Sequence, residues 1–159
     1  MEHYIKLFKS FTYAFSGLFY VIKTERNMRI HLTCMIYMFS ILSLTDWFVL
    51  TKAEWAILIL TCAVVISLEI VNTAVENAVN LASEEITPYG KIAKDAAAGA
   101  VLVSAIASVA VGLVIMLQPS AFVAMYEYFK ENLLMLALAA LSLIPATLFI
   151  FFGLPFKRK

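Results

Sequence analysis

Four polar side chains that could take part in chemistry lie within a long apolar part of the chain. Residues 69–80 read EIVNTAVENAVN and follow WAILILTCAVVISL, residues 55–68, with no turn signal between the two segments. At about 100° per residue in an α-helix, these four residues share one narrow face. They are Glu69, Asn72, Glu76 and Asn80. Because a carboxylate in contact with lipid is costly, this face must point toward protein, water or a bound cation.

Two further pairs of polar residues stand just before predicted apolar segments. Glu25 and Arg29 lie one helical turn apart, and Lys94 and Asp95 are adjacent. Carboxylates such as Glu25 and Glu76 are ligands that Mg²⁺ takes together with phosphate oxygens, and a lysine such as Lys94 neutralises phosphate charge. The combination predicts a site for a metal ion and a nucleotide. Taken singly, each charge has the simpler interpretation of a solvated group at a membrane boundary.

The composition indicates that these residues belong to a membrane protein. The chain has 159 residues, of which 63% are hydrophobic and 14% charged, far from the usage of soluble domains. Its formal net charge of +1 and the lack of a basic patch argue against binding to nucleic acid. Cys34 and Cys62 lie in apolar runs, so we interpret them as small buried hydrophobic residues and not as a disulfide.

Four apolar stretches are long enough to cross a bilayer as helices, at about 1.5 Å per residue. The predicted spans are residues 30–50, 55–81, 96–117 and 133–154. Ahead of them, residues 4–23 combine lysines and aromatic residues with a helical period, which predicts an amphipathic helix at the membrane surface. The predicted fold class is therefore an all-α integral membrane protein with a surface helix and four spans.

The positions of lysine and arginine predict the orientation of these spans. Of the 12 Lys and Arg residues, only Lys52 and Lys130 fall on one side of the predicted membrane. Because loops rich in Lys and Arg stay in the cytoplasm, both termini are expected to be cytoplasmic. The same topology brings the Glu76 end of its span close to the cytoplasmic surface, within reach of a cytosolic ligand.

Several stretches make the sequence similar to a known family. They are SFTYAFSGL, ERNMRIHL, SLEIVNTAVENAVNL and KIAKDAAAGAVLV. Over residues 6–117 the chain resembles the prokaryotic diacylglycerol kinase family, particularly its undecaprenol kinase branch from Gram-positive bacteria. The resemblance implies a lipid kinase of the bacterial cell membrane, with a surface helix and a three-helix core, that assembles as a homotrimer. We therefore expect a kinase domain at residues 1–118.

Residues 119–159 form an expected C-terminal extension, because the span at residues 133–154 departs from the family's three-helix core. The extension ends in Lys157, Arg158 and Lys159, which could associate with anionic lipid headgroups. No ionisable residue lies within the span itself, so the sequence alone assigns it no chemistry.

The resemblance also implies a role for each candidate residue. Glu25 and Glu76 match carboxylates that bind Mg²⁺, and Glu69 matches the proposed general base. Arg29 matches a position that supports the site from the start of the first span. With ATP as phosphoryl donor, the implied nucleotide-binding residues are Lys9, Tyr13, Asn72, Glu76, Asn80, Lys94 and Asp95. Asn80 stands where the family usually has Asp.

The expected function is phosphorylation of undecaprenol to undecaprenyl phosphate with ATP and Mg²⁺, and the alternative lipid substrate is diacylglycerol. A cation or proton transporter is a second interpretation, because such proteins also carry acidic residues inside spans. It accounts for Glu69 and Glu76 but gives Lys94 and Asp95 no role. A membrane scaffold without catalytic activity is a third interpretation. It would tolerate the change Glu76→Gln.

Overall fold

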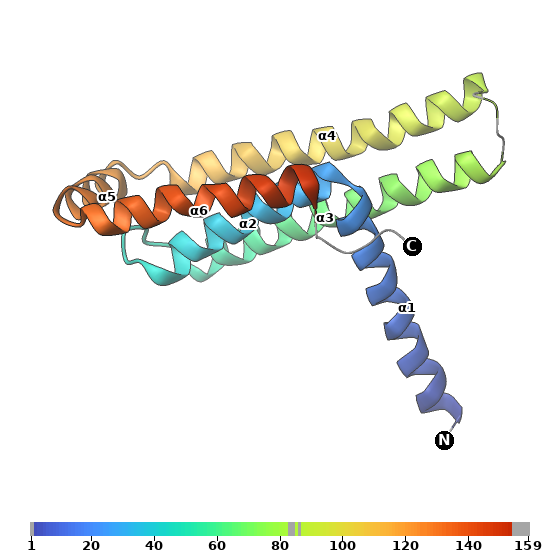
Figure 1. Ribbon diagram of the computed structural model, residues 1–159, viewed down its shortest axis with the longest axis horizontal. Coiled ribbons are helices and arrows are strands. Elements are labelled where there is room, and N and C mark those ends of the chain that lie inside the picture. Colours follow the sequence, from blue (N-terminus) through green and yellow to red (C-terminus); the bar gives the residue numbers. More distant parts are fainter. Residues whose placement is uncertain (1, 83–84, 86, 154–159) are drawn as a thin grey trace.

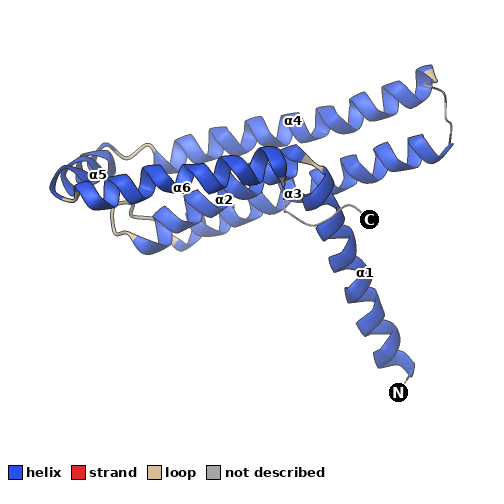
Figure 2. Cartoon of the chain, viewed as in Figure 1, coloured by secondary structure: helices blue, strands red, loops and turns tan. Residues whose placement is uncertain are grey.

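The computed structural model describes residues 2–82, 85 and 87–153, and within these ranges every regular element is an α-helix (Figures 1 and 2). The helices are α1 (Glu2–Thr24), α2 (Arg26–Leu44), α3 (Lys52–Ala82), α4 (Pro88–Met116), α5 (Pro119–Glu131) and α6 (Leu133–Phe152). The prediction of an all-α fold is confirmed. The basic tail of Lys157, Arg158 and Lys159 lies outside the described residues.

Helix α1 leaves the rest of the molecule at a sharp corner (Figure 1). The corner is Glu25, whose extended backbone (φ −95°, ψ 120°) separates the last turn of α1 from the first turn of α2. The Glu25 N–H donates a hydrogen bond of 2.8 Å to the Val21 carbonyl, which closes α1. On α1 the aromatic side chains of Phe8, Phe15 and Phe19 are exposed, so within one chain they are not part of a hydrophobic core.

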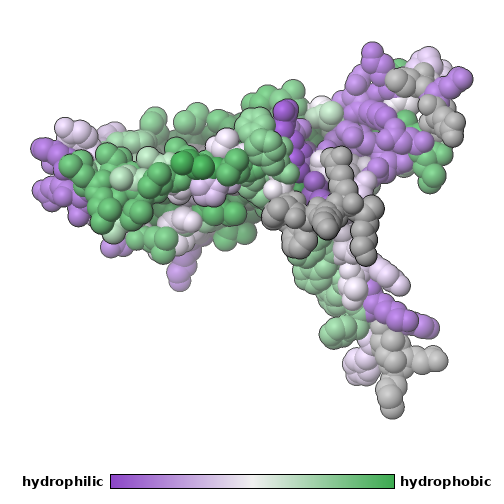
Figure 3. All heavy atoms as spheres, in the orientation of Figure 1, coloured by the Kyte–Doolittle hydropathy of each residue, from purple (hydrophilic) through white to green (hydrophobic). Residues whose placement is uncertain are grey.

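The long helices α2, α3, α4 and α6 run side by side (Figure 1). Among the described residues, three helices are each long and apolar enough to cross a membrane, namely α3, α4 and α6. The span predicted at residues 30–50, which falls in α2, is not among them. Helix α3 has 31 residues and α4 has 29, which at about 1.5 Å per residue exceeds a bilayer core of about 30 Å. One end of the α3–α4 hairpin therefore extends past the other helices, and hydrophilic side chains gather there (Figure 3).

Two helix boundaries differ from the predicted spans more than the others do. Helix α2 ends at Leu44 because Thr45 is extended (φ −131°, ψ 154°), and residues 45–51 are not helical, whereas the predicted span ran to residue 50. Helix α4 begins at Pro88 and not at residue 96. There the Thr87 hydroxyl accepts a hydrogen bond from the Gly90 N–H at 3.0 Å, an N-cap that is joined by a proline in the first turn.

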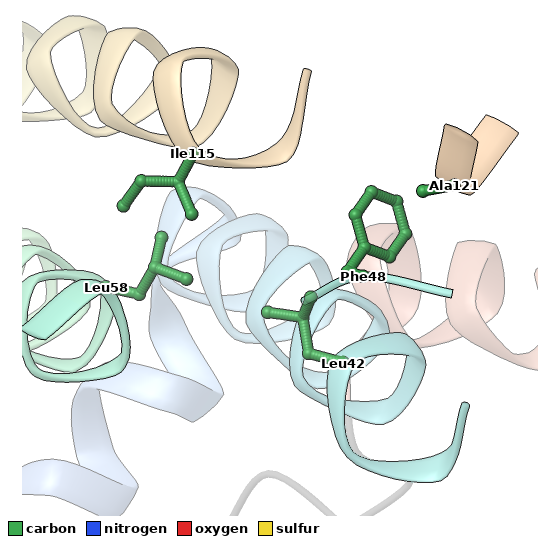
Figure 4. Packing of buried hydrophobic residues seen from close by; sticks show 5 residues of the cluster. All are labelled: Leu42, Phe48, Leu58, Ile115 and Ala121. Atoms are coloured by element: carbon green, nitrogen blue, oxygen red, sulfur yellow. The ribbon is translucent and has the colours of Figure 1, made fainter. Parts of the chain in front are cut away.

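The core is concentrated at the end of the bundle where α5 lies across it. Buried apolar side chains from α2, α3, α4, α5 and the α2–α3 connection meet there (Figure 4): Leu42, Phe48, Leu58, Ile115 and Ala121. Next to them, the Trp47 ring packs edge-on against Tyr128 and Phe129 at centroid distances of 5.3 and 5.6 Å. Helix α5 was not predicted, and these aromatic contacts hold it to the α2–α3 connection.

Candidate functional site

The polar face of α3 lies where α3 packs against α2 and α4. Glu69 is 1% exposed, Thr73 is buried and Asn72 is 7% exposed. The Thr73 hydroxyl donates to the Glu69 carbonyl at 3.0 Å, so it needs no partner on another helix. The helical period predicted that these side chains share one face, and on that face Glu69 and Asn72 are buried in the protein.

The Glu69 carboxyl group lies close to two other acidic residues and to the start of α2. It interacts with the backbone N–H of Met28 and with the negative charges of Glu25 and Glu76. Met28 is in the first turn of α2, where backbone N–H groups have no intrahelical partner and the helix dipole favours a negative charge. One carboxyl oxygen, Oε2, is buried without a hydrogen-bond partner among the described residues.

A cavity of about 240 Å³ opens beside Glu69. Its polar lining comes from Asn27 and His31 of α2 and from Glu69 and Asn72 of α3, and the remaining lining is apolar, largely from α4. Like Glu69 Oε2, the side-chain oxygen Oδ1 of Asn72 is buried and has no hydrogen-bond partner among the residues that the structure describes. Because unpartnered buried oxygens are costly, this cavity is suited to a ligand or water that donates hydrogen bonds or to a cation.

The polar face continues from the buried Glu69 to the exposed end of the α3–α4 hairpin. Asn72 Nδ2 donates to Glu76 Oε1 at 3.0 Å. Farther along, Lys94 Nζ of α4 donates to Asn80 Oδ1 at 2.6 Å. Asp95, also on α4, is exposed. The structure thus brings the predicted residues of α3 and Lys94 into one row that leads from solvent to the cavity.

Arg29 belongs to the corner between α1 and α2 and not to this row. Its side chain is 6% exposed. It donates through Nη1 to the carbonyls of Ile22 at 3.2 Å and Lys23 at 3.1 Å, and through Nε to the Ile150 carbonyl of α6 at 3.0 Å. The sequence singled out Arg29 but not its acceptors, because a backbone carbonyl can belong to any residue type.

Lys9 and Tyr13 are not brought to the row within one chain. Both side chains are exposed, Tyr13 by 72%. They lie on α1, which extends away from the bundle (Figure 1). For these two residues the implied nucleotide contact stays a prediction.

In the described part of the chain, the acidic residues do not form a complete metal site by themselves. The described residues contain no group of three or more His, Cys, Asp or Glu that could hold a metal ion by themselves. Mg²⁺ commonly needs only one or two carboxylates when substrate phosphates and waters complete its shell. Glu25 and Glu76 both act on Glu69 electrostatically and could supply these two.

Most of the chain, including this site, matches the profile of a known family. The profile of the family described as prokaryotic diacylglycerol kinase matches residues 12–116, a segment that holds every candidate residue except Lys9. The chain belongs to this family. It is a lipid kinase, and the transporter and scaffold interpretations are set aside. The matched segment ends at Met116, so helices α5 and α6 of the kinase lie beyond it.

Curated relatives carry two substrate names. The chain is 40% identical over 112 residues to the undecaprenol kinase of Bacillus subtilis, covering 70% of this chain and 89% of that protein. It is 42% identical over 114 residues to a diacylglycerol kinase of Synechocystis, covering 71% of this chain and 63% of that protein. A diacylglycerol kinase of Helicobacter pylori is 32% identical over 101 residues, 64% of this chain and 77% of its own. No solved structure matches the chain.

Proposed function

We propose that the lipid kinase transfers the γ-phosphoryl group of ATP to the hydroxyl group of undecaprenol in the presence of Mg²⁺. The observation that supports this most is the position of Glu69, a buried carboxylate beside a cavity and at the inner end of a row of polar residues. An aqueous nucleotide approaching along the row and a lipid alcohol reaching the cavity would meet at this carboxylate.

The residues have separate roles in this proposal. Glu69 Oε2 has no hydrogen-bond partner in the described part of the chain, so it could accept the proton of the lipid hydroxyl as general base. Glu25 and Glu76 would hold Mg²⁺, which when bound neutralises charge on the phosphates. Lys94 and Asn72 bind and orient the nucleotide, together with Asn80 and Asp95 at the exposed end.

We propose undecaprenol and not diacylglycerol as the substrate because the chain covers a larger share of the undecaprenol kinase than of the Synechocystis diacylglycerol kinase. The named undecaprenol kinase is covered over 89% of its length and the Synechocystis diacylglycerol kinase over 63%, although the two identities are nearly equal. A diacylglycerol kinase activity is therefore the alternative, and it would use the same row of residues.

Orientation and assembly complete the proposal. With both termini in the cytoplasm, as the Lys and Arg distribution favours, the exposed end of the α3–α4 hairpin faces cytosolic ATP. In a homotrimer, the exposed side chains of Lys9 and Tyr13 on α1 could contact the kinase site of a neighbouring copy, although they do not reach the site of their own chain.

The test is transfer of labelled γ-phosphate from ATP to undecaprenol and to diacylglycerol, presented in parallel to the purified protein in mixed micelles with Mg²⁺. Faster labelling of undecaprenol is expected. Preference for diacylglycerol would support the alternative substrate. Labelling of neither lipid by folded protein would contradict the proposed reaction.

A small effect is expected for the change Asn80→Asp. The substitution turns the hydrogen bond with Lys94 into an ion pair, but Asn80 is exposed, and exposed ion pairs contribute only about 0–1 kcal/mol. The KM for ATP should therefore change by no more than about fivefold. Steady-state kinetics at several salt concentrations measure it, and a much larger change would mean that the charge of residue 80 acts on the bound nucleotide beyond its contact with Lys94.

A further inference from the structure

The carboxyl end of α6 is fastened to the corner where α1 meets α2. Arg29 makes the connection with one guanidinium group, since Nε donates to the Ile150 carbonyl at 3.0 Å and Nη1 donates to the Ile22 and Lys23 carbonyls. All three carbonyls belong to the last turns of α6 and α1, where helical carbonyl groups lack intrahelical partners and carry partial negative charge. The contact therefore satisfies two helix ends with one buried cation.

Glycine is required at the point where α6 ends. Gly153 has φ 70° and ψ −161°, a backbone region that is essentially restricted to glycine. Its N–H donates to the Phe149 carbonyl at 3.0 Å, and a Cβ added to it would lie 3.6 Å from Arg29 Cζ. Gly153 thus ends the helix directly beside the guanidinium group that holds Ile150.

Two groups of the same corner interact with Glu69. Glu25 is the extended residue of the corner, and the Met28 N–H belongs to the turn that follows it. Both interact with the Glu69 carboxyl group. The position of the corner therefore decides how Glu25 and the start of α2 are placed against Glu69.

We propose that the carboxyl end of α6 is a positioning element for the kinase site, acting through Arg29 on the α1–α2 corner that bears Glu25. Helix α6 lies outside the segment that the family profile matches, so this support is an addition to the family core. A second contact keeps α6 in register on α2, a hydrogen bond of 2.8 Å between Tyr37 Oη and Ser142 Oγ. The assignment of Mg²⁺ to Glu25 rests on the proposed function, whereas the contact of α6 with the corner through Arg29 does not.

The experiment compares Gly153→Ala with Gly112→Ala in the full-length protein. Gly112 is a matched control, because a Cβ at this position in α4 meets no atom within 4 Å. Gly153→Ala strains the backbone that ends α6, so the last turn, which carries the Ile150 carbonyl, is expected to shift against Arg29. Since small displacements of catalytic groups have large effects, the free Mg²⁺ concentration at half-maximal rate should rise about threefold or more for Gly153→Ala and stay unchanged for Gly112→Ala.

Amide hydrogen exchange of the α1–α2 corner provides a readout that does not depend on activity. In Gly153→Ala, residues 22–28 should exchange about threefold or more faster, because the corner opens more often when its support from α6 is weakened. Arg29→Lys should act in the same direction, since an ammonium group lacks the planar fork that reaches both helix ends. If Gly153→Ala does not fold, Ser142→Ala replaces it, because it weakens the hold of α6 on α2 without a change at the corner.

The outcomes separate this inference from the proposed function. Faster exchange at the corner together with a higher Mg²⁺ requirement supports the inference. Unchanged exchange at residues 22–28 overturns it, as does faster exchange with an unchanged Mg²⁺ requirement in an active protein, which would make the contact purely structural. A wild-type protein that phosphorylates lipid without Mg²⁺ would instead contradict the proposed function, and the exchange experiment would still decide whether α6 holds the corner.

Discussion

Replacing Glu69 by glutamine is expected to lower kcat by about 10²- to 10⁴-fold, the range that general-base catalysis contributes. The KM for ATP should stay nearly constant, because Glu69 lies at the buried inner end of the polar row, beside the cavity, and not among the residues of its exposed end. Glutamine has almost the same shape and can still accept a hydrogen bond from the Met28 N–H. Initial rates in mixed micelles, with ATP and lipid varied separately, give both constants.

The folded state should tolerate this change. Glutamine removes a negative charge that lies near those of Glu25 and Glu76, so repulsion inside the protein decreases and the thermal unfolding temperature should not fall. Glu131→Gln is a suitable control, because it makes the same replacement at an exposed residue of α5. Equal losses in kcat and in ATP affinity for Glu69→Gln would contradict the role of general base.

The second large effect is expected for Glu76→Gln, which should raise the free Mg²⁺ concentration at half-maximal rate by about 10- to 100-fold. An amide oxygen is a weaker ligand for Mg²⁺ than a carboxylate, and the net negative charge of the site falls. The glutamine Oε1 can still accept the hydrogen bond from Asn72 Nδ2, so the local structure is retained. A titration of the rate with free Mg²⁺ at fixed MgATP measures the shift.

Rapid inactivation by a chelator should accompany this result in the wild-type protein and be reversed by added Mg²⁺. Glu131→Gln again serves as the control and should leave the titration unchanged. If Glu76→Gln lowers kcat but leaves the Mg²⁺ titration where it was, Glu76 is not a metal ligand and acts only by orienting Asn72.

The arrangement of the α3 side chains could be predicted from the sequence because it depends on one local rule. In a helix, residues three and four positions apart share a face, and a carboxylate in a membrane span must avoid lipid. These two conditions are enough to turn Glu69 and Asn72 inward, as the structure has them. They do not require any knowledge of which helix packs against the face.

The contacts of Arg29 could not be predicted, because their acceptors are backbone carbonyls. Ile150 is 121 positions away in the chain, and an apolar residue in an apolar helix gives no sign that its carbonyl is bonded. The only signal was Gly153, which follows the last helical residue of α6 and is the residue expected there.

The missed helix α5 and the early end of α2 have a common cause. The spans were predicted from the length of apolar stretches. The actual start and end of a helix depend on individual residues that begin or interrupt it. Thr45 and Asp46 interrupt the predicted first span, and Pro119 begins α5 with an apolar period that places Phe122 and Phe129 toward the bundle.

Helix α6 has no buried residue along its 20 positions within the described chain. Where α6 crosses a membrane its exposed side chains would face lipid tails, and leucine, isoleucine, valine and phenylalanine are nearly equivalent in such surroundings. Exchanging one for another should therefore be almost neutral, so a library of apolar replacements would give a flat tolerance profile over most of α6. Tolerance to replacement should be low at Ser142 and, just past the helix, at Gly153. The sequence of α6 would then be constrained only at the positions that contact the rest of the enzyme.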